Sequence, residues 1–302
     1  MFDQNKVFLG IAPIGWCNDD MPELGAENTF QQIVSEMALA GFTGCEIGNK
    51  YPSDPVELKK ALDLRGMRIA SRWYSSFILT RPIEEEIADF NKNLDFLEAV
   101  GANRINVSEQ SYSIQGQMDT PVLTGGHKHV MNDEEWDRFC KGLNTLGKIA
   151  TERGFKLCFH HHMGTVVQTS EETDRMMSNT DPRYVFLCFD TGHFTFAGED
   201  PVKMLEKFAD RVGHCHLKNM RMPIVEKVRA ENWSFLDAVR NGAFTVPGDP
   251  DGCVQFDDVF ALLDKAGYEG WIMVEAEQDP AKANPFEYAK MARAYIKEHA
   301  GL

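Results

Sequence analysis

Clusters of basic residues, membrane-spanning apolar runs and nucleotide-binding motifs are all missing from this sequence of 302 residues. Its net charge is -15 and its lysines and arginines are scattered, so we do not expect a nucleic acid partner. No apolar run approaches the length of a membrane span, and the first residues lack the apolar core of a signal peptide. We therefore expect a cytoplasmic protein that binds neither nucleic acid nor membranes.

Cysteine is present without a pattern. The 7 cysteines are scattered, with no pair at the spacing of a metal-binding or redox motif, and most lie in apolar contexts. We therefore expect small core residues and no disulfide framework. The glycines of segment 248–252 also lack a phosphate-binding pattern, which argues against nucleotide and nicotinamide cofactors.

What the chain does contain is a repeated unit of strand, loop, helix and glycine. No linker rich in proline, glycine or serine interrupts the eight repeats, so we expect one domain over residues 1–302. Parallel strands need helical crossovers, and closing the sheet removes its edges. The pattern therefore predicts a single (β/α)8 TIM barrel. The expected strands are 7–14, 42–47, 68–73, 103–107, 156–162, 186–190, 212–217 and 271–276. The main expected helices are 29–40, 54–65, 82–100, 133–153, 201–208, 231–240, 256–266 and 285–299, and segment 170–173 is expected to cap a further short helix.

Imidazoles and carboxylates gather at the ends of four of these strands. The residues are His160, His161, His162, Asp190, His193, His214, His216, Lys218, Glu275 and Glu277. In a TIM barrel the chemistry lies at the C-terminal rim, and alternate side chains point inward. His160 and His162 then share one direction, while His161 points away from the site and is expected to be structural. We expect the inward residues to form one site.

A divalent cation is the economical explanation for this gathering. Burying Asp190 and Glu275 together without a cation would be costly. A mixed set of nitrogen and oxygen donors suits manganese, cobalt, zinc or magnesium, and the donor types do not choose among these metals.

Several further residues have two interpretations each. Lys218 either reaches a metal-bound oxyanion or forms a rim salt bridge with Glu275 or Glu277. Glu109 and His193 either move protons or orient a ligand. Trp16 and Asn18, beside two aspartates at the end of the first strand, either line a ligand pocket or belong to a solvated loop. Helical faces near Trp136 and Tyr288 either pair subunits in a homo-oligomer or are ordinary surface.

Three motifs resemble the xylose-isomerase-like barrels that bind one divalent metal. They are Phe189-Asp190-Thr191-Gly192-His193, His214-Cys215-His216-Leu217-Lys218 and Val274-Glu275-Ala276-Glu277. The resemblance implies that Asp190, His216 and Glu275 are metal ligands. Many relatives place a glutamate on the fifth strand, where this chain has His160 and His162. We take His160 as the fourth ligand, with His162 and Glu109 as alternatives.

Other motifs narrow the resemblance to the inosose dehydratase family. They are Ile11-Ala12-Pro13-Ile14-Gly15-Trp16, Glu36-Met37-Ala38-Leu39-Ala40-Gly41, Gly48-Asn49-Lys50 and His160-His161-His162-Met163-Gly164-Thr165. The family implies dehydration of 2-keto-myo-inositol to a trihydroxycyclohexane-1,2-dione, with manganese or cobalt and sometimes glutathione.

We expect Glu109 or His162 to remove the substrate proton, and Lys218 or His193 to stabilise or protonate the departing oxygen. Trp16, Asn18 and Glu277 are the expected substrate contacts. The alternative is a metal-dependent isomerase or epimerase of a keto sugar, because the same enolate serves both reactions.

Overall fold

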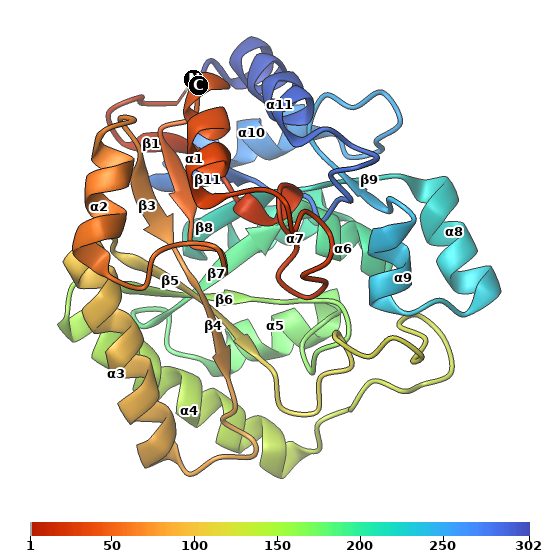
Figure 1. Ribbon diagram of the computed structural model, residues 1–302. Helices are drawn as coiled ribbons and strands as arrows, with labels where there is room; N and C mark the ends of the chain where they lie inside the picture. Colours follow the sequence, from red (N-terminus) through yellow and green to blue (C-terminus); the bar gives the residue numbers. More distant parts are fainter. Residues whose placement is uncertain (1) are drawn as a thin grey trace.

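The computed structural model describes residues 2–302, which form a barrel of strands inside a ring of helices (Figure 1). Nine strands of the described chain form one sheet in the order β3-β2-β1-β11-β8-β7-β6-β5-β4, and neighbouring strands are parallel. The strands are β1 (Val7–Ile11), β2 (Gly44–Glu46), β3 (Arg68–Ser71), β4 (Trp73–Ser76), β5 (Arg104–Glu109), β6 (Lys156–His160), β7 (Val185–Asp190), β8 (Val212–Leu217) and β11 (Gly270–Val274).

The two ends of this strand order meet and close the barrel. β3 and β4 lie at opposite ends of the order, yet only Arg72 separates them in the sequence. They are therefore two parts of one interrupted strand, which pairs with β2 through its first half and with β5 through its second. Counted this way, the barrel has eight strands, and the predicted (β/α)8 fold is confirmed.

Helices connect the strands and cover the outside of the barrel (Figure 1). Most begin where a side chain accepts a hydrogen bond from a free backbone N–H, as Asn132 does in a capping box with Glu135. Glycine ends several, such as Gly101 with its φ of 81°. None of the described helices has the length and apolar character needed to cross a membrane. The helices that follow the predicted pattern are α1 (Phe30–Leu39), α2 (Pro55–Asp63), α3 (Ile83–Val100), α4 (Asp133–Glu152), α5 (Ser170–Asn179), α7 (Pro201–Phe208), α10 (Phe256–Lys265) and α11 (Pro285–Ala300).

Some elements differ from the sequence prediction. A short helix that was not predicted, α6 (Thr191–Ala197), begins directly at the end of β7. The carboxylate of Asp190 caps it by accepting from the His193 N–H. The predicted helix 231–240 is α9 (Phe235–Arg240), preceded by α8 (Met222–Glu231). A small antiparallel pair, β9 (Asn219–Met220) and β10 (Phe244–Thr245), flanks them. Trp136 is buried, so it does not offer an exposed pairing face.

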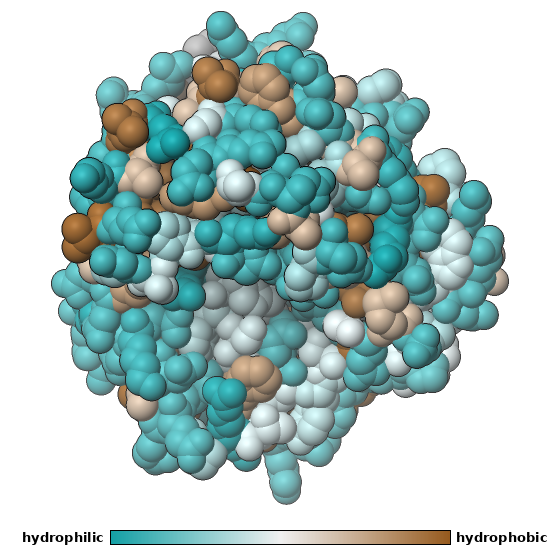
Figure 2. Space-filling view, in the orientation of Figure 1, coloured by the Kyte–Doolittle hydropathy of each residue, from teal (hydrophilic) through white to brown (hydrophobic). Residues whose placement is uncertain are grey.

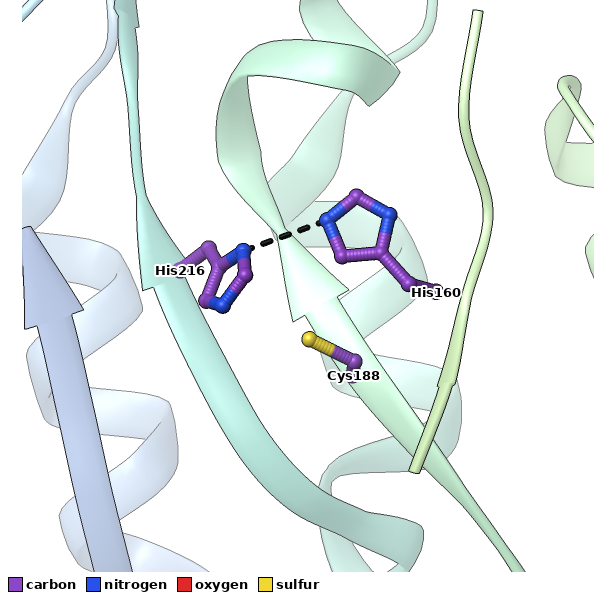
Figure 3. A group of neighbouring side chains, drawn as sticks. All are labelled: His160, Cys188 and His216. Carbon is purple, nitrogen blue, oxygen red and sulfur yellow. Dashed lines mark hydrogen bonds between the residues drawn. The ribbon is translucent and has the colours of Figure 1, made fainter. Parts of the chain in front are cut away.

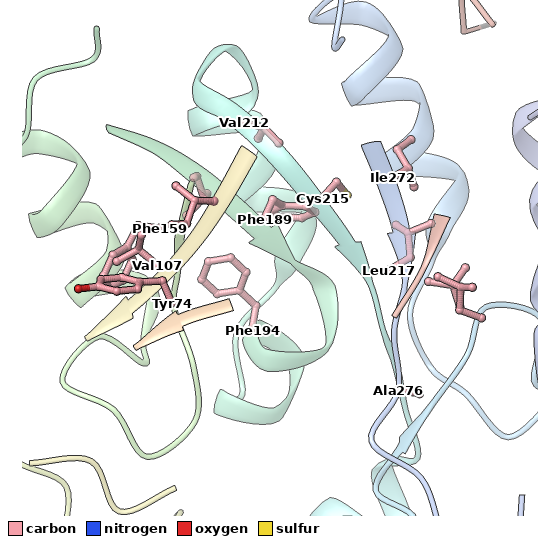
Figure 4. Packing of buried hydrophobic residues seen from close by; sticks show 14 of the residues in the cluster. Tyr74, Val107, Phe159, Phe189, Phe194, Val212, Cys215, Leu217, Ile272 and Ala276 are labelled. Atoms are coloured by element: carbon pink, nitrogen blue, oxygen red, sulfur yellow. The ribbon is translucent and has the colours of Figure 1, made fainter. Parts of the chain in front are cut away.

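The outward side chains of the strands make the main apolar core. Phe159, Phe189 and Leu217 pack there among other buried apolar side chains of strands and helices (Figure 4). His161 follows the same direction and stacks on Phe194 with 3.7 Å between ring centroids. As predicted, it belongs to the layer between barrel and helices.

The inward side chains change from apolar to polar along the barrel axis. At the N-terminal end, Ala70, Trp271 and Met273 form a small apolar cluster with Phe8 packed against it. Towards the C-terminal end of β11, the next inward residue is Glu275. The barrel therefore has an apolar floor beneath a polar mouth.

A glycine makes room for that floor. A Cβ on Gly44 would lie 2.2 Å from a ring carbon of Trp271, whereas a Cβ on Gly116 would meet nothing within 4 Å. We predict that Gly44→Ala lowers the free energy of unfolding by about 1–3 kcal/mol through overpacking, measured by urea denaturation. Gly116→Ala is the control and should stay within about 0.5 kcal/mol of the parent. Equal stabilities of the two variants would contradict the packing described here.

Candidate metal centre and active-site cavity

A cavity of about 290 Å³ opens at the C-terminal ends of the strands. The face of the molecule in Figure 2 is hollowed in its middle, and the surroundings of the hollow are mostly hydrophilic. The volume is at the lower end of the range for small-molecule sites. The lining residues are Ala12, Pro13, Ile14, Asp19, Asp20, Glu46, Ile47, Trp73, Ser75, Asn106, Gln115, His160, His162, His216, Lys218, Glu275 and Glu277.

Four of the predicted ligands meet beside this cavity. One donor atom from each of His160, Asp190, His216 and Glu275 lies within 4.8 Å of the others. Nδ1 of His216 is 2.5 Å from Oε2 of Glu275 and 3.5 Å from Oδ2 of Asp190, and Nε2 of His160 is 3.3 Å from the same Asp190 oxygen. Of the three candidates for the fourth ligand, the structure brings His160 into this group.

The donor group fits a divalent cation. Oδ2 of Asp190 is buried and accepts no hydrogen bond of good geometry, although a buried carboxylate oxygen normally has a donor. Oε2 of Glu275 is buried against Nδ1 of His216, 2.5 Å away. Burial opposes ionisation of Asp190, but the Lys218 ammonium and the neighbouring histidines His193, His160 and His216 together outweigh it and hold the pKa of this carboxyl well below its usual range. Two ionised carboxylate oxygens crowded against two imidazole nitrogens are an arrangement that a cation would satisfy.

A thiol lies next to this group. Cys188 precedes Asp190 by two residues, so it points inward on the same strand, and Figure 3 shows it beside the hydrogen-bonded pair His160 and His216. The two ring nitrogens of that pair are 3.1 Å apart. Burial raises the pKa of the Cys188 thiol to about 11, so it is protonated at neutral pH when no metal binds it.

Lys218 forms the centre of a second polar group at the same rim. Its Nζ is 2.7 Å from Oε1 of Glu277 and 2.9 Å from Nε2 of His193. Burial disfavours the ammonium charge, but Asp190, Glu275 and Glu277 outweigh it and raise the pKa of Lys218 above its usual value. Lys218 therefore forms a salt bridge with Glu277 and also lines the cavity.

His162 stands on the other side of His193, with 3.8 Å between their ring centroids. Its Nδ1 donates to the carbonyl of Met163 at 2.9 Å, which leaves Nε2 with a lone pair. Burial holds the pKa of His162 well below its usual value, so the ring is neutral at pH 7.

Burial also raises the pKa of Glu277, the partner of Lys218, to about 7.

Comparison with known proteins places the chain in a family. Residues 34–299 match the model of the xylose isomerase-like TIM barrel. Inosose dehydratases from Clostridium beijerinckii and Geobacillus thermodenitrificans are each 58% identical to it over 302 residues, the full length of both chains. The chain belongs to the inosose dehydratase family. Among solved structures, the IolI protein with a bound zinc atom has a TM-score of 0.71 at 14% identity, covering 97% of this chain and 98% of its own.

Two predicted substrate contacts, Trp16 and Asn18, lie off the cavity of this inosose dehydratase family member. The indole N–H of Trp16 donates to Glu36 on α1, 2.6 Å away, so the ring packs against that helix. Asn18 caps its own loop by accepting from the N–H groups of Asp20 and Met21. These positions do not fit the substrate contacts expected of Trp16 and Asn18.

Glu109 is also turned away from the cavity. It is fully buried and accepts from the Ser76 hydroxyl at 2.7 Å and from the Ile78 N–H at 3.0 Å. It therefore holds the loop after β4, which does not fit a proton-transfer role. His193 lies behind Lys218 and His162, so it contacts the lining residues without lining the cavity itself.

Sequence reasoning missed other residues at the site, above all Glu46. It also missed the lining roles of Trp73 and Asn106, whereas Asp19, left open between pocket lining and solvated loop, lines the cavity. Burial raises the pKa of Asp19 to about 6. Glu46 could have been suspected from the sequence, because it is a carboxylate inside a predicted strand that is otherwise apolar.

The four-donor group predicts how metal binding responds to substitution. Glu275→Gln removes one ionised oxygen, so we expect divalent-metal affinity to fall at least about tenfold, because a change behind a ligand already costs about 10- to 100-fold. Co²⁺ titration followed by absorbance would measure this. Glu269→Gln, which alters an exposed carboxylate paired with Lys6, is the matched control and should bind like the parent. Equal affinity of both variants would contradict the ligand assignment.

Proposed function

We propose that the chain is a metal-dependent dehydratase that removes water from an inosose, a cyclic keto-polyol of inositol catabolism. The observation that carries the proposal is the meeting of His160, Asp190, His216 and Glu275 at a small cavity, in a chain that matches inosose dehydratases over its full length. The cavity lies at the C-terminal rim, where TIM-barrel enzymes carry out their chemistry.

The charges around the cavity support an uncharged polyol as substrate. Its ionisable lining includes five carboxylates, Asp19, Asp20, Glu46, Glu275 and Glu277, whereas Lys218 is the one lysine or arginine among the described lining residues. Carboxylates accept hydrogen bonds from hydroxyl groups. A phosphorylated sugar would instead meet an excess of negative charge.

His160, Asp190, His216 and Glu275 would hold the metal. A bound divalent cation polarises the ketone and lowers the energy of the enolate formed next to it. We favour manganese or cobalt, and the donor set also admits zinc or magnesium. Zinc is the metal bound in the IolI structure. A glutathione requirement stays a prediction.

His162 is our choice for the base. Its Nδ1 donates to Met163, so the lone pair of the neutral ring is on Nε2, and the residue lines the cavity. It would take the proton from the carbon next to the ketone, and the electrons of that C–H bond would form the enolate. The neutral ring has the lone pair that this step needs.

Lys218 and Glu277 would complete the elimination. The Lys218 ammonium stabilises negative charge that develops on substrate oxygen. Glu277, with a pKa of about 7, is a donor of suitable strength for the β-hydroxyl. The enolate electrons form the new C=C bond, the C–O bond breaks, and the hydroxyl leaves as water with that proton. The remaining enol relaxes to a 1,2-dione.

The first test distinguishes dehydration of inosose from epimerisation of a ketohexose. We expect the metal-loaded protein in deuterated water to convert inosose to the dione and to leave ketohexoses unchanged, with NMR following both substrates. Epimerisation of a ketohexose without dehydration of inosose would overturn the proposal in favour of the isomerase or epimerase alternative. Absence of both reactions with Mn²⁺, Co²⁺, Zn²⁺ and Mg²⁺ would also overturn it.

The second test addresses the base. We expect His162→Gln to lower kcat by about 10²- to 10⁴-fold, the usual loss for a general base, while Co²⁺ affinity stays unchanged. His127→Gln in the exposed part of the long loop is the matched control and should keep full activity. A His162→Gln variant with parental kcat would show that another group removes the proton.

A further inference from the structure

One oxygen of Glu46 collects four hydrogen-bond donors inside the barrel. Oε1 is 2.5 Å from the Ser71 hydroxyl, 2.8 Å from Nδ2 of Asn106, 2.8 Å from Nε2 of His214 and 3.0 Å from Nε2 of His216. These donors come from β3, β5 and β8, while Glu46 itself ends β2. Ser71 lies on the neighbouring strand β3, whereas the contacts with Asn106, His214 and His216 run across the barrel interior.

This contact decides which nitrogen of His216 faces the candidate metal. An ionised carboxylate only accepts hydrogen bonds, so Nε2 of His216 must carry a proton to bond with Glu46. The other ring nitrogen, Nδ1, is the one that lies 2.5 Å from Glu275 and 3.5 Å from Asp190. When Nε2 carries the proton of a neutral ring, the lone pair is on Nδ1, among the other donors.

We propose that Glu46 is a positioning residue for the metal: it fixes His216 in the tautomer and orientation that present Nδ1 to the cation. A carboxylate behind a ligating histidine also increases the basicity of the ring. The proposal rests on the metal site of the proposed function, and it adds a residue outside the four-donor group.

The hydrogen-bond partners of Glu46 distinguish it from a buried carboxylate that only stabilises the fold. Ser71, Asn106 and His214 give Glu46 three donors besides His216, so its side chain is held before any metal binds. Glu109 is also a buried carboxylate that accepts several hydrogen bonds. Its donors are a serine hydroxyl and backbone N–H groups near β4 and β5, and none of them is a candidate metal ligand. The two glutamates therefore form a matched pair, of which Glu46 contacts a candidate ligand.

The test compares Glu46→Gln with Glu109→Gln in the full chain. Each variant removes one buried charge at nearly constant volume. We expect Glu46→Gln to weaken Co²⁺ binding by about 10- to 100-fold, the usual effect of losing such a partner, and Glu109→Gln to bind like the parent. Thermal unfolding of the metal-free proteins reports any loss of stability separately, and a purely structural role would lower the Tm of Glu46→Gln without changing Co²⁺ affinity. That result would overturn the proposal.

A second measurement needs no variant and covers the case in which Glu46→Gln does not fold. In the Zn²⁺-loaded parent, ¹⁵N NMR of the His216 ring should show a proton on Nε2 and the metal on Nδ1. Metal on Nε2 would overturn the Glu46 proposal while leaving the metal site intact. A parent that binds neither Co²⁺ nor Zn²⁺ would overturn this proposal and the metal dependence of the proposed function together.

Discussion

Two buried carboxylate oxygens crowded against imidazole nitrogens are the constraint on which the rest of the site depends. Oδ2 of Asp190 and Oε2 of Glu275 lie at the mouth of the barrel, against the ring nitrogens of His160 and His216. Ionised oxygens in such a place are costly unless positive charge is close. Lys218 supplies part of that charge at 3.6 Å from each oxygen, and a divalent cation would supply the rest.

The polar mouth is divided between two tasks. One side gathers the four candidate metal donors, with Glu46 behind His216. The other gathers His162, Lys218 and Glu277, a neutral imidazole, an ammonium and a carboxyl whose pKa is near 7. Groups whose pKa values are pushed apart in this way suit a reaction that takes a proton from one atom and returns one to another. A small cavity between them limits the substrate to a compact molecule.

Alternation along strands explains why much of the site was predictable. Because every second residue of a strand points inward, His214, His216 and Lys218 had to share a direction, and so did Cys188 and Asp190. The stacking of His161 on Phe194 follows from the same rule. Closure of the barrel was predictable from the repeated units, although the break at Arg72 was not, because the sequence there continues as strand.

The predicted and observed positions of site residues differ where the alternation of side chains along a strand ends or is too short to recognise. Trp16 and Asn18 lie beyond β1, and their directions are set by contacts with α1 and with their own loop. Glu109 is at the end of β5, where loop N–H groups drew its carboxylate away from the cavity. Glu46 was overlooked because its strand has three residues, too few to show alternation, and because its partners are far away in the sequence.

A crystal structure of the cobalt-loaded protein, with anomalous diffraction at the cobalt edge, tests the central claim most directly. We expect one strong anomalous peak within bonding distance of His160, Asp190, His216 and Glu275. No peak at that position, or a peak held instead by His162, His193 and Glu277, would contradict it.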